Sequence, residues 1–143
     1  MFDAFLRARL ARFAGLSDVV FRVTLCLIFL IGGIGHFMRS DEMLARLLDS
    51  PWLDQVMMIG NPLALLHLSG AVFVIGSPFM IAGYSTRLAA LAMFMTLVPI
   101  TVTIHIAPGH EGPLFKNIAI LGALFYVFIN GAKCCALDLR RHP

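Results

Sequence analysis

The stretch VVFRVTLCLIFLIGGIGHF, residues 19–37, decides the fold of this chain. Its one charged side chain is Arg22, which lies near the start of the stretch. Because a helix crosses a bilayer with about 20 mostly apolar residues, the stretch predicts a transmembrane helix over about 19–38, with Ser17 or Asp18 as its N-terminal cap. Its apolar core is longer than that of a cleaved signal peptide, so we expect the segment to be retained.

Three further apolar stretches predict transmembrane helices over about 62–84, 87–107 and 114–132. The connection between the first two of these is so short that they must form an antiparallel hairpin. The polar residues 39–61 keep apolar side chains at helical spacing, which predicts a short interfacial helix at the membrane surface. The predicted fold class is therefore all-α: a four-helix transmembrane bundle in a single integral membrane domain over residues 1–143.

The composition of the chain is that of a protein embedded in the lipid bilayer. Of the 143 residues, 59% are hydrophobic and 13% are charged, and the mean hydropathy is +0.88, whereas a soluble domain carries about 25% charged residues. These values exclude a disordered chain, and three cysteines are too few for a disulfide-rich miniprotein. Basic residues flanking apolar spans account for the net charge of +3, so we expect no nucleic-acid partner.

The Lys and Arg residues predict how the chain is oriented in the membrane. With the N-terminus inside, eight of the 11 fall on the cytoplasmic side, namely Arg7, Arg9, Arg12, Arg22, Arg87, Lys133, Arg140 and Arg141. The other three, Arg39, Arg46 and Lys116, fall outside. Because cytoplasmic loops carry an excess of Lys and Arg, both termini are expected in the cytoplasm, and the two longer loops, 39–61 and 107–115, on the outer side.

This topology places several polar residues from different spans at one depth, near the outer face. The set is His36, His67, His105, Lys116 and Asn117, with Asp41, Glu42, His110 and Glu111 as possible contributors from the loops. Ionisable groups inside a membrane are costly, and they usually face the bundle interior, a partner or a water-filled cavity. The set is therefore the predicted ligand-binding site.

The residue types leave several chemistries open at this site. The imidazoles can hydrogen-bond a quinone carbonyl and relay protons near neutral pH, or form a pH-sensitive contact with a partner protein. A transition metal or haem iron held by His36, His67 and His105 has less support, because no local metal-ligand spacing is present. Alternatively, each histidine lies at the polar interface and hydrogen-bonds to lipid headgroups, water or backbone. The sequence has no nucleophile-elbow or phosphate-loop pattern, so no catalytic residue is predicted.

Helical spacing also predicts which faces pack together. Polar and apolar residues recur at intervals of three or four on one face of the first span: Arg22, Cys26, Phe29, Gly33 and His36. Small residues mark places where helix backbones can approach closely: Gly32, Gly33 and Gly35 on the first span, and Gly70 with Ala71 on the second.

The cysteines leave two alternatives open. Cys134 and Cys135 are adjacent and follow the fourth span on the predicted cytoplasmic side, where thiols stay reduced. They form either a redox centre or an ordinary part of the tail. Cys26 is expected to be buried in the packing of the bundle.

Three segments carry a family resemblance: FRVTLCLIFLIGGIGHF (21–37), HLSGAVFVIGSPFMIAGYSTRLAALAMF (67–94) and FKNIAILGALFYVFINGAKCCALD (115–138). In their order and spacing they resemble the DoxX-like family of small four-helix membrane proteins. The resemblance implies a bacterial inner-membrane location. It also implies a place in a quinone-linked oxidoreductase complex, such as thiosulfate:quinone oxidoreductase, or an accessory or assembly role.

By this resemblance Arg22, Arg87, Lys116 and Asn117 correspond to recurrent polar positions of the family. The chain departs from the family pattern at two places, because His36 stands where relatives commonly have Lys and His67 where they often have Glu. The first functional hypothesis is a membrane redox subunit that binds quinone or a redox partner at the outer polar set. The alternatives are an accessory protein that holds a protein partner through Trp52 and the apolar face of 43–53, and metal or haem handling. A homo-oligomer is compatible with each.

Overall fold

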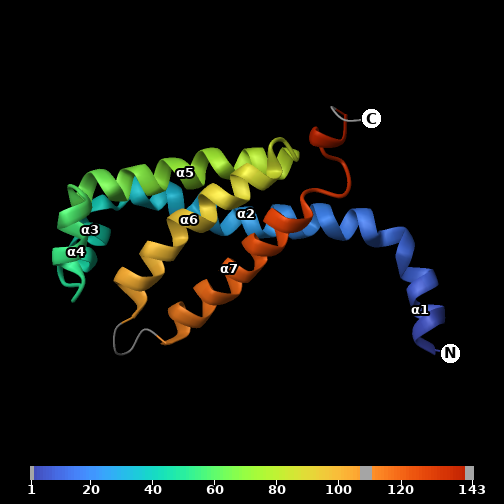
Figure 1. Cartoon of the computed structure of the whole chain (residues 1–143), viewed down its shortest axis with the longest axis horizontal. Helices are drawn as coiled ribbons and strands as arrows, with labels where there is room; N and C mark the ends of the chain where they lie inside the picture. Colours follow the sequence, from blue (N-terminus) through green and yellow to red (C-terminus); the bar gives the residue numbers. More distant parts are fainter. Residues whose placement is uncertain (1, 107–110, 141–143) are drawn as a thin grey trace.

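The computed structural model describes residues 2–106 and 111–140, which hold helices and no strand (Figure 1). The helices are α1 (Phe2–Leu10), the 3-10 turn η1 (Ala11–Phe13), α2 (Ala14–Met38), α3 (Ser40–Leu48), α4 (Leu53–Ile59), α5 (Pro62–Ala82), α6 (Thr86–His105), α7 (Glu111–Asn130) and the 3-10 turn η2 (Asp138–Arg140). The predicted all-α fold class is confirmed.

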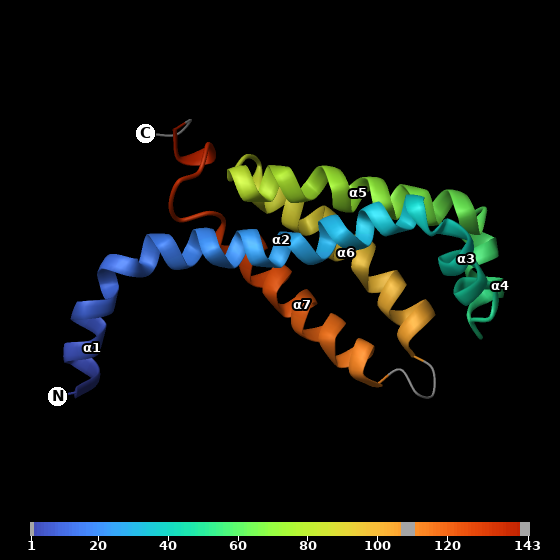
Figure 2. The ribbon, with the colours of Figure 1, turned by 180° about the vertical axis from the view of Figure 1, so that it is seen from behind.

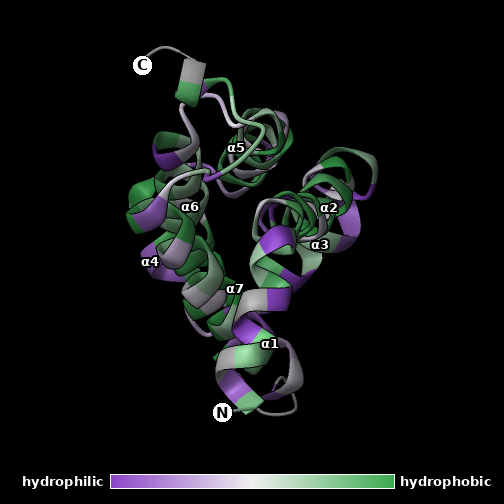
Figure 3. Cartoon of the chain, turned by 90° about the vertical axis from the view of Figure 1, so that its right-hand side faces the viewer, coloured by the Kyte–Doolittle hydropathy of each residue, from purple (hydrophilic) through white to green (hydrophobic). Residues whose placement is uncertain are grey.

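Four helices are long and apolar enough to cross a membrane: α2 with the turns that precede it, α5, α6 and α7. They correspond to the spans predicted near 19–38, 62–84, 87–107 and 114–132. Hydrophobic residues run along these helices, whereas hydrophilic residues concentrate in α1 and at helix ends (Figure 3). Since most side chains of each span are not covered by protein, lipid is the medium that these helices contact.

The segment between the first two spans holds two short helices, α3 and α4, where the sequence predicted one. The break falls at Ser50–Pro51, because a proline disfavours helical geometry in the residue before it. The Ser50 hydroxyl donates to the carbonyl oxygen of Thr103, and α3 packs on α5, so the segment covers one end of the bundle. Leu47 is buried and Trp52 half-buried there, so the apolar face predicted for a protein partner is partly used inside the chain.

The long helices pack in sequence order: α2 on α5, α5 on α6 and α6 on α7. Within the described residues, α2 and α7 pack together much less than any of these pairs. They meet where the ring of Phe21 contacts Tyr126 edge-on, with 6.0 Å between ring centroids. From that crossing α7 diverges from α2, as seen from both sides of the molecule (Figures 1 and 2). The bundle is thus closed at one end and more open at the other.

Glycine sets the close approach of α2 to α5. A Cβ on Gly33 would lie 2.9 Å from the carbonyl oxygen of Gly70, and a Cβ on Gly70 would lie 2.8 Å from the Cβ of His36. Both distances are too short for any side chain, so the prediction of glycine-mediated packing is confirmed at this pair. Gly32 has open space instead.

Candidate functional site

The predicted inward face of α2 is confirmed. Arg22, Cys26, Phe29 and Gly33 are buried, and His36 is half-buried at the end of the same face. Cys26 and Phe29 belong to a continuous apolar core with Phe73 of α5, Met93 of α6 and Leu124 of α7, among others. Arg22 and His36 therefore lie at the two ends of this core.

At one end, which we call the histidine end (His36, His67, Ser69, Thr101 and Asn117), His36 joins α2 to α5. Its Nδ1 lies 2.8 Å from the Ser69 hydroxyl and 3.1 Å from the carbonyl oxygen of Leu66. The Ser69 hydroxyl itself donates to the Leu66 carbonyl over 2.7 Å. Since the hydroxyl proton of Ser69 is donated to Leu66, the Nδ1–H of neutral His36 is the donor to Ser69. The Nε2 of His36 is then the ring nitrogen with a free lone pair.

His67 lies beside His36 at the same end. Its ring stacks on Phe37 with 5.3 Å between centroids and an interplanar angle of 18°. The His36 ring in turn lies 5.8 Å from that of Phe73. Two of the three predicted histidines are thus brought together on α2 and α5, framed by phenylalanine rings.

The other predicted site residues lie on α6 and α7. Asn117 is buried and its amide donates to the Thr101 hydroxyl over 3.1 Å, which joins these two helices. His105 is half-buried in the last turn of α6, whereas Lys116 is exposed. The loop contributors Asp41, Glu42 and Glu111 are exposed, and His110 lies outside the described residues.

The structure does not assemble a metal-ligand set from these groups. In residues 2–106 and 111–140, no three His, Cys, Asp or Glu side chains lie close enough together to hold a metal ion. His36, His67 and His105 therefore do not form a common ligand set in this geometry, and the histidine end offers hydrogen-bonding groups.

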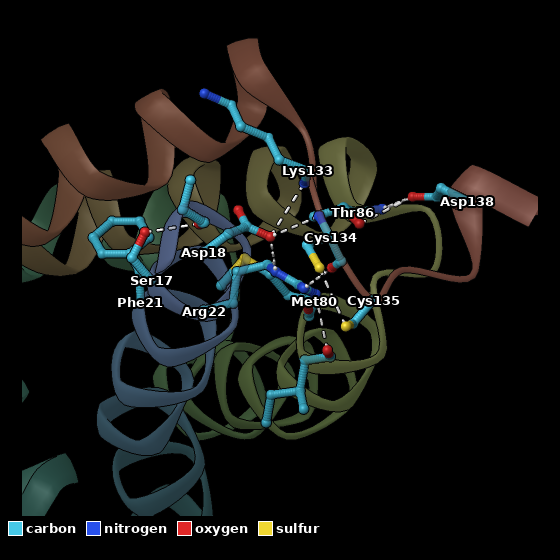
Figure 4. Close-up of polar contacts among 12 residues, drawn as sticks. Ser17, Asp18, Phe21, Arg22, Met80, Thr86, Lys133, Cys134, Cys135 and Asp138 are labelled. Atoms are coloured by element: carbon cyan, nitrogen blue, oxygen red, sulfur yellow. Dashed lines mark hydrogen bonds and ion pairs between the residues drawn. The ribbon is translucent and has the colours of Figure 1, made fainter. Parts of the chain in front are cut away.

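The opposite end of the bundle holds a polar cluster that the sequence did not single out as a site. We call it the clasp: Asp18 and Arg22 of α2 with the backbone of Met80, Ile81 and Cys134 (Figure 4). Arg22 is 1% exposed and donates to the carbonyl oxygens of Met80 (3.0 Å), Ile81 (2.9 Å) and Cys134 (2.7 Å). Its Nε also pairs with the Asp18 carboxylate at 3.2 Å.

Asp18 also binds the tail, the described residues 131–140 that follow α7. Its Oδ2 accepts hydrogen bonds from the backbone N–H groups of Lys133 (3.1 Å) and Cys134 (3.2 Å). The prediction that Ser17 or Asp18 caps the first span was wrong, because α2 already begins at Ala14. A carboxylate four residues before a buried arginine was the available signal, since residues i and i+4 share a helix face.

Asp138 attaches the tail to the bundle at a second place, the start of α6. Its carboxylate accepts from the backbone N–H of Ser85 (2.7 Å) and from the N–H and hydroxyl of Thr86 (2.9 Å each). The free N–H groups at the start of α6 are thereby capped. Gly83 permits this approach, because it takes a φ of +64° and a Cβ there would collide with Ala136.

Comparison with known families identifies this architecture. The family model DoxX matches residues 17–106, which is more than half of the chain and includes Asp18, Arg22 and Thr86. The chain belongs to the DoxX family. Searches of the curated proteins and of the solved structures return no match.

In this DoxX protein the family match ends before α7. Cys134, which accepts from Arg22, and Asp138, which caps α6, therefore lie outside the matched region. An open cavity of about 530 Å³ lies beside Asp138, between the start of α6 and the end of α7, and its walls also include Arg87 and Asn130. Arg87 and Asn117, which the resemblance singled out, thus lie at opposite ends of the bundle.

Proposed function

We propose that this DoxX protein is a subunit of a bacterial inner-membrane redox system and that it binds quinone at the histidine end. The orientation proposed with this function has both termini in the cytoplasm and the histidine end toward the outer side, as the distribution of Lys and Arg favours. The family and the four apolar helices support the membrane setting.

The observation that carries the proposal is the hydrogen-bond relay of His36. Ser69 fixes Nδ1 as the protonated nitrogen, which makes Nε2 an acceptor held in one orientation. A quinol hydroxyl can donate its proton to such an atom during oxidation, while its electrons pass to a partner protein. The aromatic rings of Phe37 and Phe73 beside the imidazoles offer flat apolar surface for a quinone ring.

The shape of the bundle supports access from lipid. α2 and α7 meet at Phe21 and Tyr126 and diverge toward the histidine end (Figure 2). A quinone is dissolved in the bilayer, so a bundle that opens toward lipid suits it. In this proposal the two histidines make the polar contacts to the quinone oxygens. Lys116 is exposed and Asn117 is engaged with Thr101, so neither is the principal contact.

The test uses the single tryptophan of the chain. Trp52 lies between α3 and α4 at the histidine end, so its fluorescence reports a bound quinone there. The full chain in lipid nanodiscs is titrated with ubiquinone-1. We expect saturable quenching, and in His36→Asn an apparent Kd about fivefold to tenfold weaker, because one hydrogen bond contributes about 1 kcal/mol. The Asn side chain keeps an N–H that donates to Ser69, but it has no acceptor atom at the position of Nε2.

The matched control is Lys133→Ala, an exposed change at the opposite end of the bundle, which should leave the Kd unchanged. Quenching that never saturates beyond that of a tryptophan ester in empty nanodiscs would refute quinone binding. An unchanged Kd in His36→Asn would refute the role given to Nε2.

A further inference from the structure

The tail carries a second site, formed by the adjacent residues Cys134 and Cys135, at the end of the bundle opposite the histidines. Their sulfur atoms lie 3.2 Å apart, in direct contact, and both are free thiols. Cys135 is exposed, whereas Cys134 is half-buried with its sulfur against Gly15 of α2. One sulfur is thus open to an approaching molecule and the other lies next to it (Figure 4).

We propose that Cys134 and Cys135 form a redox-active dithiol that exchanges with a disulfide-bearing oxidant and thereby opens or closes the clasp. This inference is independent of the quinone proposal. It concerns other residues at the other end of the molecule, on the side predicted to be cytoplasmic.

The geometry assigns different tasks to the two thiols. The Cys135 thiolate attacks one sulfur of a disulfide R–S–S–R, which forms a mixed disulfide and releases one R–SH. Cys134 then loses its proton and attacks the sulfur of Cys135, which closes the Cys134–Cys135 disulfide and releases the second R–SH. Two electrons and two thiol hydrogens pass to the oxidant, so the step balances. The hydrogen bond with Cys135 raises the pKa of the Cys134 thiol, which suits the resolving role.

The connection to the clasp is covalent. The carbonyl oxygen that accepts from Arg22 over 2.7 Å belongs to the peptide bond between Cys134 and Cys135. That peptide bond becomes part of the ring when the disulfide closes. Adjacent Cα atoms lie about 3.8 Å apart, closer than in ordinary disulfides, so the ring is strained and readily reduced. Ring closure must therefore turn the peptide bond whose carbonyl oxygen Arg22 holds, next to the Cys134 N–H that Asp18 holds.

The backbone at this point already has an unusual conformation. Cys135 takes a φ of +49°, one of two positive values among the described residues other than glycine. Such conformations persist where surrounding contacts hold them. Here the contacts are those of Arg22 and Asp18 with Cys134, so the clasp holds the dithiol in place and changes in one are transmitted to the other.

The test treats the full chain in detergent with oxidised glutathione, blocks remaining thiols with N-ethylmaleimide and measures the mass of the peptide that contains both cysteines. We expect the wild type to lose two hydrogens and take up no maleimide, and dithiothreitol to reverse this. Cys134→Ser should stop with one glutathione on Cys135. Cys135→Ser should react more slowly than Cys134→Ser, because the remaining Cys134 sulfur is half-buried against Gly15.

A wild-type peptide that carries two glutathiones, or two maleimides, would overturn the dithiol proposal. The coupling has its own readout, the melting temperature of the oxidised and reduced forms. Oxidation should change the melting temperature of the wild type and leave that of the Cys134→Ser/Cys135→Ser double variant unchanged. Full oxidation with no change in the wild type would overturn the link to the clasp.

Discussion

The two ends of this bundle are held together in different ways. At the clasp, one guanidinium joins three segments, because Arg22 of α2 reaches the last carbonyls of α5 and the tail after α7. At the histidine end the buried side chains bond in separate pairs, His36 with Ser69 between α2 and α5 and Asn117 with Thr101 between α6 and α7, and Ser50 adds a bond to Thr103 of α6. The first end is therefore locked across the bundle by one buried charged group, whereas the second is held by separate contacts of neutral groups.

The reason for the difference is the charge of the groups involved. The carbonyls of Met80 and Ile81 belong to the last turn of α5, where the helix dipole is negative and few intrahelical donors remain. A buried guanidinium there satisfies those carbonyls and is itself satisfied by them and by Asp18. The hydroxyl, amide and imidazole groups at the other end are neutral, and each bonds to a group on the adjacent helix, so no contact there needs a third segment.

Removal of Arg22 is the most direct way to break this comparison. We expect Arg22→Met to destabilise the protein by about 3–5 kcal/mol, the cost of leaving one partner of a buried ion pair without the other. The measurement is unfolding of the purified protein in mixed detergent micelles. Arg7→Met is the matched control, because the Arg7–Asp3 pair is 82% and 85% exposed and should contribute little. Equal stability of the two variants would show that the clasp does not lock the bundle.

The contact of α2 with α5 offers the next largest effect. Gly33→Ala places a methyl group 2.9 Å from the backbone oxygen of Gly70 in α5, and such overpacking costs about 1–3 kcal/mol. Gly32→Ala is the control one residue away, where a methyl group meets nothing within 4 Å. The same unfolding assay should separate the two variants. If both behave alike, the close approach at Gly33 and Gly70 is not what joins these helices.

The sequence predicts the parts of this fold that depend on periodic hydrophobicity. The four spans, the inward face from Arg22 to His36 and the close approach at Gly33 follow from spacing and residue size alone. Pro51 is visible in the sequence as a helix-disfavouring residue, but the apolar spacing continues on both sides of it. That spacing alone does not show that the segment divides into two helices.

The clasp could not be predicted in the same way. Apart from the Arg22–Asp18 pair, its contacts join positions 58 to 116 residues apart, and no local pattern predicts where the residues after Asn130 return. A polar residue before an apolar run is usually a helix cap, so the sequence favours that role for Asp18. At the histidine end, topology predicted a common depth for five side chains, but depth does not determine partners. His36 and His67 came together, Asn117 paired with Thr101, and Lys116 stayed exposed.

The smallest expected effect sharpens the comparison from the histidine end. In Ser69→Ala the Nδ1 proton of His36 still has the Leu66 carbonyl at 3.1 Å, so the loss should be about 0.5–1.5 kcal/mol, the net value of one hydrogen bond. The control is Thr96→Ala, whose hydroxyl bonds only within its own helix, to Ala92. A loss as large as that of Arg22→Met would mean that this end is locked too. The expected small loss fits an end that can yield to a bound molecule without unfolding the bundle.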